Sequence, residues 1–390
     1  MNTIMRSVLV QTEIQREWIQ KLEQQREEFQ SYAQSNDEQS RFPYENIQWL
    51  VDSGYTQLTL PKEYGGAGAT IEDMVVLQSV LGSIDGATAL SIGWHVGLVG
   101  ELFERQLWDK DVLDEFAEAV KAGALINRAV SEAETGSPTR GGRPSTHATL
   151  EGDTYTLNGV KTFTSMSRGL THVIVAAYIP HKEKVGFFYI PKESEGLEVA
   201  DNWNVVGMRA TESHDLVLND VKVHEKYLVE IKGEGPKFQN GWMLHIPSTY
   251  LGIAQAARDY AIDFSLTHSP NSIEGTISDL PVVQQNLGKM ETKLLTARHM
   301  LWSTARAYQT LSDADDISAE TAASKIIVMN EGLDVVDIAM RIVGAKSLEM
   351  DRPLQRYYRD MRAGLHNPPM EDMTYTNISR GVLEERREHL

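Results

Sequence analysis

The chain has 390 residues, enough for about two or three domains, and 41% of them are hydrophobic, so it can bury a sizeable core. A formal net charge of −18 argues against a nucleic-acid-binding face and against adsorption on an anionic membrane. The lack of cysteine excludes disulfides, thiolate metal sites and a cysteine nucleophile, and we expect no other metal site. The N-terminus turns polar too soon for a secretory signal and no run of about 18 apolar residues occurs, so we expect a cytoplasmic protein.

Residues 1–124 are predicted to form a helical domain. The first 40 residues are rich in Gln, Glu and Arg, and their few apolar residues recur at spacings of four and seven, which predicts one helix packed by a single edge. Pro43 and Gly54 mark the start and end of the next helix, since proline suits a first turn and glycine a C-terminal cap. The turn-rich segment LPKEYGGAG then precedes a helix over residues 70–84.

Residues 125–235 change character and are predicted to form an antiparallel, barrel-like β unit. β-branched and aromatic residues dominate five short segments, at 155–157, 173–179, 185–190, 215–218 and 221–223. Turn signals separate them, at Asn158-Gly159, Pro191-Lys192 and Asn219-Asp220.

Two motifs in this unit suit a flat ligand that forms hydrogen bonds. The segment VSEAETGS places Ser131, Gly136 and Ser137 close together, and small hydroxyl residues beside glycine let backbone N–H groups approach a ligand closely. The segment NGVKTFTS ends with Phe163 and Ser165, and an aromatic residue alternating with hydroxyls suits stacking on one face and a hydrogen bond at one edge. A surface turn followed by a hairpin is the alternative interpretation of the same residues.

Residues 236–390 return to helix and are predicted to form a four-helix bundle that also carries subunit contacts. From Ile326 to Val343, apolar residues recur alternately every three and four positions, as in a buried bundle helix. A second helix begins near Val283 and has apolar residues on one inner face. We interpret the apolar residues of both helices as part of the hydrophobic core.

The order and spacing of these motifs resemble the acyl-CoA dehydrogenase superfamily over about residues 42–362. VSEAETGS followed by NGVKTFTS resembles its flavin-binding segments T-E-P-x-x-G-S-D and N-G-x-K-x-W-I-T. LPKEYGGAG resembles L/V-P-E-E-Y-G-G-x-G, and GMRATES, which contains Arg209, resembles G-x-R-x-S-x-T. The resemblance implies an α+β fold with an N-terminal helical domain, a central β domain and a C-terminal bundle.

The same resemblance implies a flavin, FAD or alternatively FMN, between the β domain, the C-terminal bundle and a neighbouring subunit. The positions that match its flavin contacts are Val130, Ser131, Gly136, Ser137, Phe163, Ser165, Gln284 and Gly344. Gln284 matches a position that contacts the cofactor of the adjacent subunit. Substrate contacts are implied for Ser137, Arg209 and His95. A buried core role for His95 and an ion pair for Arg209 are the alternatives.

The sequence departs from the family where the catalytic base is expected. Eight residues after the Asp of its R-D pair, here Asp360, the family has the Glu of Y-E-G-T, but this chain has Pro368. A second known position for the base falls at Trp242. Glu371 is the candidate base, because it is a carboxylate that lies close in sequence to the expected position. Its alternative role is a favourable charge at a helix N-terminus. The R-x-x-F-G segment expected before Gln284 is also absent.

Three functions are therefore open. The first is α,β-dehydrogenation of an acyl-CoA thioester in fatty acid metabolism, by a homodimer or homotetramer that passes electrons to a partner. The second is oxygenation of a small molecule with reduced flavin and O2, because RDMRAGLHNP resembles the tail of the flavin-dependent monooxygenase branch and His366 matches its histidine. A turn hydrogen bond is the alternative role of His366. The third is a non-catalytic member of the family that keeps the fold for binding or assembly.

Overall fold

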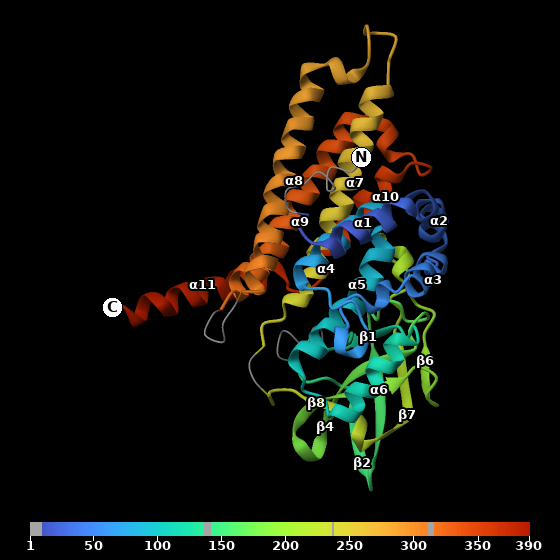
Figure 1. Cartoon of the computed structure of the whole chain (residues 1–390), viewed down its shortest axis with the longest axis vertical. Helices are drawn as coiled ribbons and strands as arrows, with labels where there is room; N and C mark the ends of the chain where they lie inside the picture. Colours follow the sequence, from blue (N-terminus) through green and yellow to red (C-terminus); the bar gives the residue numbers. More distant parts are fainter. Residues whose placement is uncertain (1–9, 136–141, 236–237, 311–315) are drawn as a thin grey trace.

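The computed structural model describes residues 10–135, 142–235, 238–310 and 316–390. Helices from both ends of the chain pack together at one end of the molecule, and a sheet occupies the other end (Figure 1). The two sets of helices share one hydrophobic core, which includes Trp18 near the N-terminus and Trp302 in the C-terminal part. The sheet has a core of its own, with Val175 and Phe188 among its members.

Before the sheet, the described part of the chain forms six α-helices: α1 (Glu13–Gln24), α2 (Arg26–Gln39), α3 (Tyr44–Asp52), α4 (Ile71–Ile84), α5 (Gly86–Arg105) and α6 (Lys110–Lys121). The single polar helix expected over the first 40 residues is wrong, because the helix is interrupted at Gln25 between α1 and α2. The buried side of this pair also contains polar groups. The amide of Gln15 donates to the Asp73 carboxylate of α4 at 3.0 Å, so α1 is fixed by a buried hydrogen bond as well as by its apolar edge.

The sheet consists of β1 (Ile126–Ala129), β2 (His147–Glu151), β3 (Thr154–Lys161), β4 (His172–Ile179), β5 (Lys184–Pro191), β6 (Leu197–Val199), β7 (Leu216–His224) and β8 (Leu228–Ile231). Their order is β6-β7-β3-β2-β4-β5-β8, with β1 beside β4. The expected barrel-like closure is wrong: within the described residues β6 and β8 are edge strands and the sheet stays open. The sheet is also mixed rather than antiparallel throughout, because β1 and β2 pair with β4 in parallel.

Two of the three expected turns lie inside strands. Asn158-Gly159 is in β3 and Asn219-Asp220 is in β7, and the pairing of these strands shifts register between Leu157 and Gly159. Asn158 Nδ2 donates to Asp220 Oδ1 at 3.0 Å across the strands. Residues with turn-like backbone preferences therefore form a β-bulge here, which bends the sheet without ending it.

After the sheet the chain forms α7 (His245–Thr267), α8 (Pro281–Tyr308), α9 (Ser318–Val343), α10 (Pro353–Ala363) and α11 (Glu371–Glu388). Helices α7 to α10 pack as a bundle, and α4 lies along α7. Of the expected inner-face residues of α8, Met290, Leu294 and Leu301 are buried and Leu287 is half-buried. Helix α11 extends away from the bundle (Figure 1). No helix in the described ranges is both long enough and apolar enough to span a membrane.

Candidate functional site

The two small-residue motifs of the β unit meet where β1 and β3 end. Thr162 N–H donates to the carbonyl oxygen of Ser131 at 2.9 Å. One residue away, Lys161 Nζ donates to Glu132 Oε1 at 2.6 Å, and both side chains are buried. Burial raises the pKa of Glu132, but hydrogen bonds from Lys161 and Thr146 outweigh this and lower the pKa to about 2. An ionised buried pair thus holds the two motifs together. We call the surface formed by residues 130–131 and 162–165 the cradle.

Phe163 presents an aromatic ring at the surface of the cradle. Its side chain is 68% exposed, and its φ of +56° is uncommon for a bulky residue. Its ring meets the ring of Trp203 edge-on, with centroids 6.1 Å apart. An exposed aromatic side chain on a backbone of unusual conformation indicates a contact face for a planar ligand.

The hydroxyl side of the cradle is buried. Ser165 is buried, and its carbonyl oxygen accepts from Asn127 Nδ2 at 3.1 Å. The buried Oγ1 atoms of Thr162 and Thr164 have no hydrogen-bond partner among the described residues. Unpaired buried hydroxyls beside an exposed aromatic ring fit a flat ligand with hydrogen-bonding atoms on its edge, and a flavin is such a ligand.

The structure brings four of the expected flavin-contacting residues to this place. Val130 and Ser131 are half-buried directly after β1, and Phe163 and Ser165 follow β3. The predictions for Gly136 and Ser137 fall outside the described residues.

Gln284 and Gly344 lie elsewhere. Helix α8 begins and α9 ends toward the end of the bundle that points away from the sheet (Figure 1). Gln284 is exposed in the first turn of α8, where its Nε2 donates to the carbonyl oxygen of Ser278 at 3.1 Å. Gly344 follows α9 with a φ of +70°. Their expected flavin contact therefore requires a second copy of the chain.

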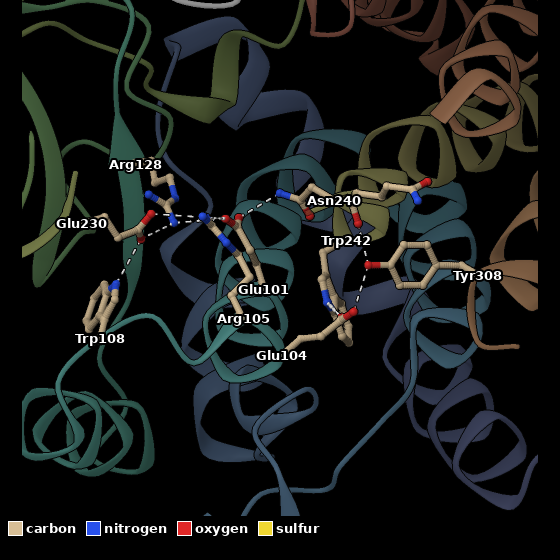
Figure 2. Close-up of polar contacts among 10 residues, drawn as sticks. Glu101, Glu104, Arg105, Trp108, Arg128, Glu230, Asn240, Trp242 and Tyr308 are labelled. Carbon is tan, nitrogen blue, oxygen red and sulfur yellow. Dashed lines mark hydrogen bonds and ion pairs between the residues drawn. The ribbon is translucent and has the colours of Figure 1, made fainter. Parts of the chain in front are cut away.

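A buried charged cluster fixes the cradle against α5 (Figure 2). Glu101 and Arg105 come from α5, Arg128 from β1 and Glu230 from β8. Arg128 donates to Glu230 at 2.8 Å and to Glu101 at 3.1 Å, and Arg105 contacts the same two carboxylates at 3.2 and 2.9 Å. Arg128 stands two residues before Val130, so these contacts set the position of the strand that leads into the cradle.

The same face of α5 also holds the linker that precedes α7 (Figure 2). Asn240 Nδ2 donates to Glu101 Oε2 at 2.9 Å. Trp242 Nε1 donates to Glu104 Oε2 at 2.5 Å, and the Tyr308 hydroxyl donates to Glu104 Oε1 at 2.9 Å. Trp242 occupies the second position that the family resemblance gives for a base. Here it joins the bundle to α5 instead.

His95 and Arg209 bond to the backbone. His95 is fully buried between Thr56 O, 2.9 Å from its Nε2, and the Ile126 N–H, which donates to its Nδ1 at 3.2 Å. Burial lowers the pKa of His95 to about 4, so the imidazole is neutral at pH 7. Arg209 donates to the carbonyl oxygens of Val205 and Asp37 at 2.8 and 2.7 Å. His95 therefore joins β1 to the segment around Thr56, and Arg209 joins the loop before β7 to α2.

The C-terminal tail contains His366 and the candidate base Glu371. His366 is exposed after α10, and the neighbouring Asn367 accepts a hydrogen bond from the Tyr250 hydroxyl of α7 at 2.6 Å. Glu371 is half-buried at the start of α11, and its carboxylate accepts from the Tyr375 hydroxyl at 3.0 Å and from Asn330 Nδ2 of α9 at 3.4 Å.

The buried Asp360 has a different role. It accepts the Met208 N–H at 2.6 Å, which ties α10 to the loop before β7. Burial raises the pKa of Asp360 to about 7 although this hydrogen bond opposes the change. Its neighbour Arg359 forms an ion pair with Asp37 of α2. The R-D pair thus connects three parts of the chain.

Comparison with known proteins places this geometry in a family. The models named acyl-CoA dehydrogenase N-terminal, middle and C-terminal domain match residues 12–106, 127–221 and 244–365. The chain is 51% identical over 380 residues to YdbM of Bacillus subtilis (strain 168), provisionally named an acyl-CoA dehydrogenase, and the match covers 97% of this chain and all of that protein. The chain belongs to the acyl-CoA dehydrogenase family, whose members are flavin-dependent oxidoreductases.

Solved structures share the fold. Butyryl-CoA dehydrogenase from Megasphaera elsdenii matches with a TM-score of 0.85 at 20% identity, covering 96% of this chain and 99% of that one. Methanesulfinate monooxygenase MsuC from Pseudomonas fluorescens matches with a TM-score of 0.83 at 21% identity, covering 94% and 97%. One fold thus carries both dehydrogenases and monooxygenases, and the fold alone does not separate them.

Proposed function

We propose that the protein is a flavin-dependent dehydrogenase that oxidises the α,β carbon–carbon bond of an acyl-CoA thioester. The observation that carries this proposal is the cradle, where the exposed ring of Phe163 stands beside the buried hydroxyl of Ser165. The name and the 51% identity of YdbM support the same reaction class. We take FAD as the cofactor, with FMN as the alternative, and the mass of the cofactor released from purified protein decides between them.

The cradle would hold the ring through four residues. A bound flavin supplies the acceptor for hydride from the substrate β carbon. Phe163 offers the face against which a planar ring packs, and Ser165 offers an edge hydroxyl. Val130 and Ser131 would border the ring on the β1 side, and Ser137, which lies outside the described residues, keeps the substrate-binding role that the family resemblance implies.

The reaction also needs a base for the α proton, and we assign this role to Glu371. The Tyr375 hydroxyl and Asn330 amide orient its carboxylate. The nearby Lys325 of α9 is buried, and burial lowers the pKa of that amine to about 8 while the Glu371 carboxylate opposes the change.

The decisive experiment is anaerobic mixing of the flavin-loaded protein with saturated acyl-CoA thioesters of increasing chain length. Bleaching of the flavin absorbance by a thioester supports dehydrogenation, and Glu371→Gln should slow it by 100-fold or more, on the order of a lost general base. Asp372→Asn is the matched control, because Asp372 is the adjacent acid of the same helix turn. Protein that stays colourless with added FAD would instead indicate a non-catalytic member of the family.

Oxygenation of a small molecule is the second candidate. It is favoured by Pro368 at the family's usual base position and by the exposed His366 two residues earlier. In that reaction His366 would deliver a proton to the bound flavin or substrate, or take one from it. The oxygenase reading predicts no bleaching by any thioester, and an oxygen-dependent flavin intermediate with a distinct absorbance when the reduced protein meets O2.

The proposal includes a homotetramer, with a homodimer as the alternative, that passes electrons to a protein partner in cytoplasmic fatty acid metabolism. The exposed helix α11 supports self-association, because 18 helical residues with one buried side chain need a covering surface. Native mass spectrometry of the purified protein gives the number of copies.

A further inference from the structure

Three helices bring polar side chains without partners to one place in the interior. Gln78 comes from α4, Trp94 from α5 and His245 from α7, and Gln78 and His245 are buried. Both amide atoms of Gln78, Trp94 Nε1 and His245 Nδ1 are shielded from water and have no hydrogen-bond partner among the described residues. Buried polar atoms of native proteins nearly always have a partner, so a group of them without one points to a ligand or a bound water.

Two glycines of α5 explain why these side chains come together. A Cβ at Gly93 would lie 2.7 Å from His245 Nδ1 and 2.9 Å from Gln78 Nε2, so both nitrogens face the same small space beside the helix backbone. A Cβ at Gly97 would lie 2.9 Å from His245 Cδ2. The ring of Trp94 meets the imidazole edge-on, with centroids 4.7 Å apart. Packing against α5 therefore fixes the imidazole and leaves its Nδ1 without a partner.

The chemistry of this group favours a neutral ligand that both donates and accepts hydrogen bonds. Gln78 offers donors and an acceptor, the indole of Trp94 only donates, and a neutral imidazole donates from one nitrogen and accepts at the other. Burial lowers the pKa of His245 to about 3, so the imidazole is neutral at pH 7. The same burial opposes a charged ligand, because water would not solvate its charge there. A hydroxyl group matches these donors and acceptors.

The group is connected to the cradle through β1. His95, the residue after Trp94, accepts the N–H of Ile126 at 3.2 Å. The next residue of the strand, Asn127, donates to the carbonyl oxygen of Ser165 at 3.1 Å. The part of α5 that carries Trp94 is therefore bonded to the strand that leads into the cradle.

Helix α7 connects the same group to the C-terminal tail. His245 is the first residue of α7, and further along the helix the Tyr250 hydroxyl donates to Asn367 Oδ1 at 2.6 Å. Glu371, the proposed base, follows in the same tail. The polar group thus stands on helices bonded to the cradle and to the tail, which hold the flavin and the base in the proposed function.

We propose that Gln78, Trp94 and His245 form a polar subsite that selects an acyl chain carrying a hydroxyl group. This inference rests on the proposed function, because the hydroxyl belongs to the acyl-CoA thioester that the proposed function oxidises. The substrate class is then the hydroxyacyl-CoA thioesters. A bound water is the other molecule that offers the same hydrogen bonds, and the test separates the two.

The test compares pairs of CoA thioesters with equal acyl chains, one with a terminal hydroxyl and one without, over a series of chain lengths. Anaerobic bleaching of the flavin gives the rate of reduction and the thioester dissociation constant. At one chain length the unchanged protein should prefer the hydroxylated thioester by about tenfold, the scale of one net hydrogen bond. Gln78→Met and His245→Leu remove hydrogen-bonding atoms, and each should reduce this preference by several-fold.

Gln255→Met is the matched control. Gln255 of α7 is also buried, but its Oε1 accepts from Arg298 Nη2 at 2.7 Å. The control should lower the urea midpoint of the substrate-free protein and leave the hydroxyl preference unchanged. Gln78→Met should not lower this midpoint, because the amide that it removes has no partner in the substrate-free protein.

Three outcomes would overturn the inference and leave the proposed function intact. They are equal bleaching by both members of every thioester pair, a hydroxyl preference that survives Gln78→Met and His245→Leu, and a loss of stability in Gln78→Met as large as that in Gln255→Met. The last outcome would assign the amide to a bound water. Absence of bleaching with every thioester would overturn the proposed function, and the inference with it.

Discussion

Lys161 donates to Glu132 at 2.6 Å in the interior of the β unit, and this contact joins the two motifs that form the cradle. The pair is shielded from water, so each charge depends on the other. Thr162, which follows Lys161, bonds to Ser131, which precedes Glu132. The shape of the cradle and folding stability are therefore coupled through one ion pair.

Lys161→Met should destabilise the protein strongly, because it leaves the Glu132 carboxylate buried without its cation. Loss of one partner of a buried pair costs about 3–5 kcal/mol. Urea denaturation followed by tryptophan fluorescence should show a lower midpoint.

The matched control for this change is the double variant E132Q/K161M, which removes both charges. It should lie closer to the unchanged protein than Lys161→Met does, because no unpaired charge remains. A double variant as unstable as the single one would mean that packing of the lysine stem, rather than its charge, determines the cost.

His95 should make stability depend on pH below neutrality. Its pKa in the folded protein is lowered to about 4, below the ordinary value of 6.5, because it is buried. The stability that this neutral imidazole contributes to the free energy of unfolding is complete above about pH 6.5. It is lost as the pH falls from 6.5 toward 4, because the unfolded chain then binds the proton more readily than the folded protein does. The expected slope is about 1.4 kcal/mol per pH unit, to be measured by denaturant titrations at pH 7, 6 and 5.

The variant His95→Gln tests the assignment of this slope. Glutamine removes the titrating group and keeps a donor and an acceptor for Thr56 and Ile126. The variant should be less stable than the unchanged protein at pH 7. Its free energy of unfolding should also depend less steeply on pH between pH 6.5 and 5. The buried His245 also has a pKa lowered by burial, to about 3, so a residual slope should remain. A variant whose slope equals that of the unchanged protein would contradict the role given to His95.

Local sequence signals predicted the elements whose ends are set by neighbouring residues. Thr70 caps α4 by accepting the Asp73 N–H at 3.2 Å, and the helix was expected from that position. The apolar faces of the bundle helices were also predicted, because the helical spacing of apolar residues alone specifies them. Asn158-Gly159 and Asn219-Asp220 were misread because a bulge and a turn favour the same residues, and only strand pairing distinguishes them.

Contacts between distant segments were the part that the sequence could not supply. The two motifs were expected to lie together and they do, through Thr162 and Ser131. The ion pair between Glu132 and Lys161 was missed, although both residues stand inside the quoted motifs. The cluster of Glu101, Arg128 and Glu230 was missed because its members come from three elements far apart in the chain. Whether the sheet closes depends likewise on which strands pair, and alternation within strands does not specify this.

Phe163→Ala should weaken flavin binding with little effect on folding. The ring is mostly exposed, so its loss removes little core packing, whereas a planar ligand loses its contact face. An increase of about tenfold in the FAD dissociation constant is expected, the scale of one aromatic contact with its buried area. Tyr44→Ala, at an exposed aromatic residue at the start of α3, is the control, and quenching of FAD fluorescence by apoprotein is the measurement. Equal FAD dissociation constants for the two variants would show that Phe163 does not contact the flavin.

Helix α11 should carry a subunit contact. Tyr375, Val382 and Leu383 are each more than half exposed on it, an arrangement that is costly for a helix in water unless another surface covers it. The variant V382D/L383D should therefore reduce the assembly to smaller species, measured by light scattering coupled to gel filtration. The variant E384A/E385A changes the next two exposed positions without placing charge on the apolar side, so it should keep the original mass. If V382D/L383D retains that mass, the copies associate through another face, and α11 contacts something else.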